Sequence, residues 1–101
     1  RQMAKQAVTA KAGECAYEDN GTVFVFVTPS LDDYEDYQEK IVGVKRRGPF
    51  MRELAQKCLK DQTQLPALQK LFERKPALAL VFANALQDLA GIEAEIVVGK
   101  D

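Results

Sequence analysis

The chain contains no histidine, and this absence limits the chemistry that the printed sequence can perform. Serine–histidine and cysteine–histidine nucleophile pairs, zinc sites that use histidine and a near-neutral imidazole switch are all excluded. Carboxylates, lysines, tyrosines and two thiols remain, but no phosphate-binding glycine loop, HExxH or GxSxG motif accompanies them. We therefore lean toward a protein that is not an enzyme, and we expect no catalytic residues, no metal and no cofactor.

The two thiols, Cys15 and Cys58, are not in a CxxC spacing. Two cysteines are too few for a disulfide scaffold, and a domain of 101 residues can form a core without one. We expect both side chains to be reduced, small and buried. This cysteine usage favours a cytoplasmic location.

Charged residues are segregated along the chain. Residues 14–39 hold eight acids and no base, whereas residues 40–75 hold ten bases and three acids. The two blocks are expected either to face each other or to face solvent separately. Five of the acids lie between positions 32 and 39, where they predict a solvated helix face rather than a calcium loop, because such loops interleave their ligands with glycine.

The basic stretch around residues 40–60 is the one surface for which the sequence suggests a partner. We expect a protein partner or a second copy of the chain, steered by complementary charge. Nucleic acid is an alternative, because lysine and arginine bind phosphates without a further motif, but the pI near 5.5 opposes it. A further alternative is a ligand-binding domain or an enzyme subunit that needs another chain. The candidate partner-binding residues are Lys45, Arg46, Arg47, Arg52, Lys57 and Tyr37.

Residues 17–28 predict a β-hairpin that organises the rest of the fold. Asn20-Gly21 favours a two-residue turn in which both central residues have positive φ. In that register the numbers of facing residues sum to 41, so Phe24 faces Tyr17 and Phe26 faces Cys15 on an uncharged side that should be core. The opposite side carries valines and glutamates. A longer loop would exchange the two faces.

Helical spacing of apolar residues predicts four helices after the hairpin. Ser30 is expected to cap the first, proline to start the second and third, Thr63 to cap the third, and Gly91 to end the fourth. Residues 77–82 could also form a strand. The first expected helix begins at Ser30 and is weakened at Gly43, and Gly48 either ends it or closes the loop after it. The other three span approximately residues 48–59, 65–75 and 77–90.

Within residues 92–99, apolar residues first alternate with glutamates, and this pattern predicts a final strand beside the hairpin. The expected fold class is α+β in the order ββααααβ, a small sheet covered by about four helices on mainly one face, in a single domain of residues 1–101. Residues 1–6 are expected to be a disordered lead-in or the trimmed end of a helix.

No apolar run in the sequence is long enough for a membrane span. The expected sheet has open edges, which favour a homodimer through an edge or through the valine face.

Overall fold

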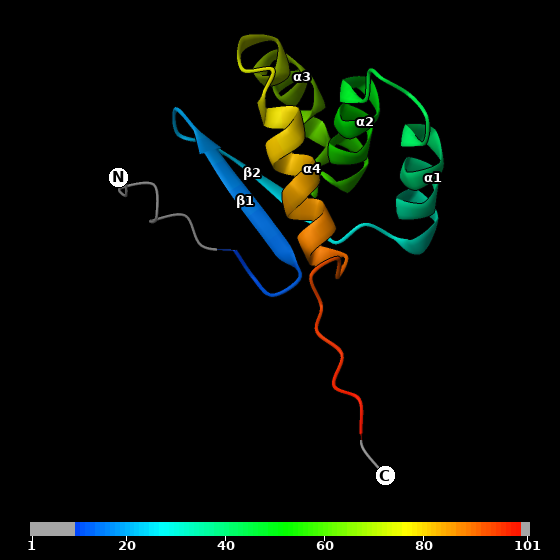
Figure 1. The fold of residues 1–101 in the computed structure, drawn as a ribbon. Coiled ribbons are helices and arrows are strands. Elements are labelled where there is room, and N and C mark those ends of the chain that lie inside the picture. The colour runs from blue at the N-terminus through cyan, green and yellow to red at the C-terminus, as the bar shows by residue number, and fades with distance from the viewer. Residues whose placement is uncertain (1–9, 100–101) are drawn as a thin grey trace.

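The structure is a computed structural model that describes residues 10–99, so the expectation for residues 1–6 lies outside the described residues. A two-stranded antiparallel sheet and four α-helices make an α+β fold, as expected (Figure 1). The elements are β1 (Glu14–Asp19), β2 (Thr22–Val27), α1 (Leu31–Ile41), α2 (Gly48–Cys58), the 3-10 turn η2 (Gln62–Gln64), α3 (Leu65–Arg74) and α4 (Leu78–Leu89).

The hairpin has the predicted turn and register. Asn20 and Gly21 have φ values of 50° and 86°, as the two-residue turn requires. Tyr17 pairs with Phe24 and Cys15 pairs with Phe26, so the aromatic side chains share one face. Phe24 and Phe26 are buried, which confirms the predicted core face.

The chain itself covers the outer edge of β2. Leu59 forms an isolated antiparallel bridge with Phe26, and the Lys60 N–H donates to the Val25 carbonyl at 2.8 Å. The Gln64 side-chain amide donates to the Val23 carbonyl at 3.0 Å. The segment after α2 therefore protects this edge from pairing with another strand.

The helix ends follow from local sequence, with one exception. The Ser30 hydroxyl accepts from the Asp33 N–H at 3.1 Å and caps α1, and Pro49 and Pro66 lie in the first turns of α2 and α3. The prediction that Thr63 caps α3 is wrong. Asp61 instead caps η2 by accepting from the Thr63 N–H, and η2 leads directly into α3.

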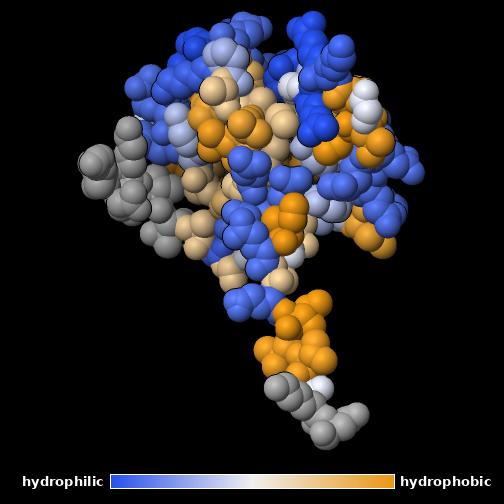
Figure 2. Space-filling model, in the orientation of Figure 1, coloured by the Kyte–Doolittle hydropathy of each residue, from blue (hydrophilic) through white to orange (hydrophobic). Residues whose placement is uncertain are grey.

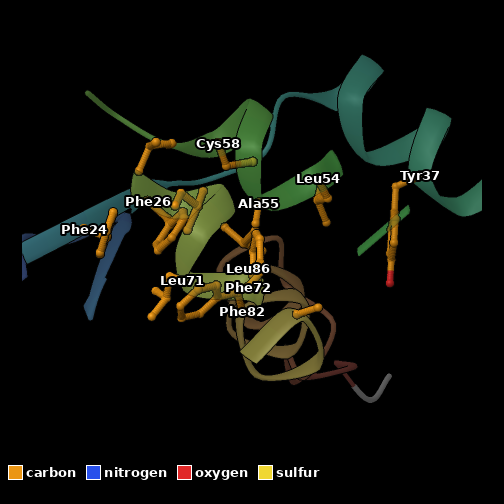
Figure 3. Close-up of a cluster of buried hydrophobic side chains, with 13 residues drawn as sticks. Phe24, Phe26, Tyr37, Leu54, Ala55, Cys58, Leu71, Phe72, Phe82 and Leu86 are labelled. Carbon is orange, nitrogen blue, oxygen red and sulfur yellow. The ribbon is translucent and has the colours of Figure 1, made fainter. Parts of the chain in front are cut away.

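The helices bury the aromatic face of the hairpin, and the Phe82 ring of α4 belongs to the same buried cluster as Phe24 and Phe26 (Figure 3). Its ring centroid is 4.8 Å from that of Phe26, 5.4 Å from that of Tyr17 and 5.8 Å from that of Phe72. One side chain of α4 thus joins both strands and α3. Residues 77–82 are helical rather than a strand, because Ala77 is the N-cap of α4, which runs from Leu78 to Leu89.

The predicted C-terminal strand is absent from the described residues. Gly91 adopts φ 100° after α4, and the Ile92 N–H donates to the Gln87 carbonyl at 3.0 Å, which closes the helix as expected. The chain then continues away from the sheet (Figure 1). A strand needs a hydrogen-bonded neighbour, and residues 92–99 meet none here, so the order within residues 10–99 is ββαααα.

Candidate interaction surface

The C-terminal segment, residues 92–99, exposes large apolar side chains. Ile96, Val97 and Val98 are 86%, 94% and 79% exposed, and Ile92 is 57% exposed. Figure 2 shows these apolar residues gathered on an extension that projects from the body of the molecule. Scattered apolar residues are normal on a surface, but a contiguous run of this exposure is typical of an interaction site.

The composition of the C-terminal segment suits a strand. Isoleucine and valine favour extended backbone, and alternate residues of an extended chain point to opposite sides. One side then carries Ile92, Ala94, Ile96 and Val98, with no charge among them. The other carries Glu93 and Glu95. The sequence predicted this strand character, while the absence of a partner strand among residues 10–99 appears only in the structure.

The outer edge of β1 has unused backbone groups. The Thr28 N–H donates to the Gly13 carbonyl at 3.1 Å, so this facing pair occupies a hydrogen-bonded position of the hairpin ladder. Bonded and non-bonded pairs alternate in an antiparallel ladder, so Ala16 and Glu18 direct their N–H and C=O groups away from β2. No backbone partner for these groups lies within residues 10–99. The β1 edge, defined by Ala16 and Glu18, is therefore open in this part of the chain.

The candidate partner-binding residues do not all lie on one exposed surface. Lys45, Arg46 and Arg47 are exposed in the loop between α1 and α2, as a basic contact surface requires. Tyr37 is only 4% exposed and belongs to the core, so it cannot belong to an exposed binding face. Its position on the apolar side of α1 explains this burial.

The remaining two candidates differ in their surroundings. Lys57 contacts Asp36 at 3.2 Å and Asp33 at 3.9 Å, so its charge is already paired. Arg52 is half-buried on α2, where it lines a groove.

Ion pairs join the acidic and basic blocks, so the two blocks face each other. Lys40 bridges Asp36 on its own helix, at 2.9 Å, to Glu53 on α2, at 3.0 Å. Lys60, after α2, contacts Glu14 of β1 at 2.8 Å. The nearby ammonium groups of Lys40 and Lys57 lower the pKa of Asp36 by hydrogen bonding. Much of the charge segregation therefore serves to orient α1, α2 and the hairpin.

A second ion-pair cluster holds the hairpin turn against the end of α3. Asp19 is 8% exposed and contacts the Arg74 guanidinium at 2.9 Å and the Lys75 ammonium at 3.3 Å. The hydrogen bond from Arg74, followed by that from Lys75, lowers the pKa of the Asp19 carboxyl despite its desolvation. A buried carboxylate must be paired, and this pair joins residues far apart in sequence.

The thiols are unpaired and poorly suited to chemistry. Burial raises the pKa of Cys58 to about 11, with a further contribution from the Asp33 charge, and burial also raises the pKa of Cys15. The thiolate is the reactive form, so burial of Cys58 and partial burial of Cys15 disfavour the reactive state of both side chains. Within residues 10–99, no group of three or more acidic or cysteine side chains could hold a metal ion.

The surface of residues 10–99 carries a groove and a smaller hollow. A groove of about 500 Å³ lies between α2 and α3, and a smaller hollow of about 240 Å³ lies beside the hairpin turn. Neither is lined by Cys58, Tyr34 or Tyr37, although a thiol or a phenol in a pocket is the kind of group that could bind or react with a small ligand. The groove residues are Arg52, Gln56, Gln69, Phe72, Glu73 and Pro76.

Comparison with known proteins establishes the fold but no function. No known protein family and no curated protein matches the sequence. The structure is similar to that of the uncharacterised protein RBSTP2171 from Bacillus stearothermophilus, with a TM-score of 0.67 and 22% sequence identity. The match covers 85% of this chain and 86% of that chain, so the two proteins share a fold. In the described part of this chain, no helix has both the length and the apolar character needed to cross a bilayer.

Proposed function

We propose that this chain is a non-catalytic protein-interaction domain that assembles with a second copy of itself. The observation that carries the proposal is the exposure of Ile96, Val97 and Val98 in the C-terminal segment. Burying apolar surface contributes about 25 cal/mol per Å², so such side chains gain free energy by leaving water. The burial of Cys58, which disfavours its thiolate, supports a non-catalytic role, and the presence of two cysteines without a CxxC spacing supports a cytoplasmic location.

Light scattering after size exclusion, over a hundredfold range of concentration, tests the proposal. The chain of 101 residues is expected to approach twice its monomer mass of 11.2 kDa as its concentration rises. A variant carrying Ile96→Ser, Val97→Ser and Val98→Ser is expected to stay monomeric.

The matched control replaces exposed apolar residues outside the C-terminal segment. Leu31 and Val42 are 72% and 75% exposed, so the double variant Leu31→Ser with Val42→Ser removes similar surface elsewhere. It should assemble as the unaltered protein does. A chain that stays monomeric at every concentration overturns the proposal.

Nucleic-acid binding is a second candidate, favoured by the exposed loop that carries Lys45, Arg46 and Arg47. Within residues 10–99 these side chains have no carboxylate at ion-pair distance. Phosphate binding by such residues weakens steeply with salt. A mixed-sequence oligonucleotide, titrated at two salt concentrations, should bind more weakly at high salt, and absence of binding at low salt excludes this candidate.

A further inference from the structure

We propose that the C-terminal segment of one copy adds as a strand to the β1 edge of a second copy. This inference rests on the proposed function and specifies the contact that would join the two copies. The segment supplies an extended apolar run, and the β1 edge supplies N–H and C=O groups that have no backbone partner in residues 10–99. Strand addition satisfies both requirements, because the ladder uses main-chain groups and alternate side chains pack on the sheet.

Both halves of this contact belong to the same chain, which favours a second copy as the partner. The C-terminal segment continues away from its own sheet (Figure 1), so it does not occupy its own β1 edge. In a twofold dimer each copy would donate one segment and accept one. Such an exchange is closed by the twofold symmetry and covers both β1 edges.

The lengths of the two partners are compatible. β1 has six residues and the C-terminal segment spans positions 92–99. The other long edge of the sheet is unsuitable, because Lys60 and Gln64 already donate to the Val25 and Val23 carbonyls of β2. The added strand would make a three-stranded sheet, and a hairpin alone is only marginally stable in water.

Two double variants separate strand pairing from nonspecific apolar contact. Ile96→Pro with Val97→Pro keeps the segment apolar but removes two consecutive N–H groups, and one of these must face β1 in any register. Ile96→Thr with Val97→Thr keeps both N–H groups and the β-branched shape but reduces the apolar surface. Strand addition predicts that the proline variant is monomeric and that the threonine variant still dimerises at higher concentration.

Hydrogen exchange of the backbone amides locates the contact. In the unaltered chain, the N–H groups of Ala16 and Glu18 should exchange at least about tenfold more slowly in the dimer than in dilute monomer. The proline variant should lose this protection at all concentrations. Since Ile96 and Val97 are 86% and 94% exposed in the structure of residues 10–99, these substitutions should leave the unfolding midpoint of dilute protein unchanged.

The alternative outcomes are distinct. A dimer without protection of Ala16 and Glu18, or one that survives the proline substitutions, overturns strand addition but leaves self-assembly standing. Protection that persists in dilute monomer shows pairing within one chain and overturns the second copy as partner. A monomer without protection at every concentration overturns both proposals.

Discussion

At the scale of single residues, charge pairing explains why a carboxylate can be buried at the hairpin turn. Asp19 is nearly inaccessible, yet two cations from the end of α3 approach it. Removing one partner of a buried ion pair leaves the other charge buried without an opposite charge. The resulting loss of stability is larger than the net stability that the intact pair contributes. The pairing therefore makes the hairpin turn dependent on α3.

Asp19→Asn is expected to destabilise the protein at pH 7, and its effect should shrink in acid. Arg74 and Lys75 lower the pKa of Asp19 in the folded state below the unfolded value of about 3.9. The ionised carboxylate thus contributes stability above that value, and the contribution is lost as pH falls through the lowered folded pKa. Urea unfolding of both proteins at pH 7 and at pH 3 measures the difference.

Glu35→Gln provides the control for this pH dependence. Glu35 is exposed on α1 and forms no ion pair within residues 10–99, so its replacement should change stability little. A difference between Asp19→Asn and the unaltered protein that is as large at pH 3 as at pH 7 would contradict the ion-pair explanation.

At the scale of elements, the hairpin turn determines which faces of β1 and β2 meet the helices. A shift of one residue would move Phe24 and Phe26 from the core to the opposite face. The turn avoids this shift because Asn20 and Gly21 tolerate positive φ. The backbone conformation at two positions thus decides the composition of the core.

Gly21→Ala should cost about 1–2 kcal/mol of unfolding free energy, since a side chain makes positive φ unfavourable. Gly21 has φ 86°, but nothing lies within 4 Å of the position that its Cβ would take. The cost is therefore conformational rather than steric. Chemical denaturation measures it.

Gly99→Ala is the matched control, because Gly99 also has open space around a Cβ but does not have positive φ. Its effect should be within about 0.5 kcal/mol. Equal stabilities for the two alanine variants would exclude turn strain as the cause.

At the scale of the whole molecule, one aromatic side chain connects most of the elements. The Phe82 ring of α4 contacts aromatic rings from β1, β2 and α3, and α2 packs against α4 through further buried residues. Stability should therefore depend on this position more than on any ion pair at the surface.

Phe82→Ala is expected to lower the free energy of unfolding by about 3–5 kcal/mol, because it removes a large side chain and leaves a cavity. Thermal and urea unfolding measure the change. Val81→Ala, at a neighbouring position that is 52% exposed, should change stability by no more than about 0.5 kcal/mol. Comparable losses for the two variants would show that the core is not organised around the Phe82 ring.

Local interactions were predictable from the sequence by itself. The Asn20-Gly21 turn, the Ser30 cap, the prolines that begin α2 and α3 and the Gly91 helix end all depend on residues close together in the chain. The pattern of apolar residues likewise identified the four helices and the core face of the hairpin, because burial imposes a period on each element.

Only the tertiary structure decided which partners the elements find. Residues 92–99 have the pattern of a strand but no neighbour to pair with among the described residues, and a strand is defined by its neighbour. Tyr37 is at the helix position that packs inward, and Lys57 and Asp19 are paired with residues distant in sequence. The physical reason is that burial and charge pairing arise from contacts between distant segments, which no local pattern specifies.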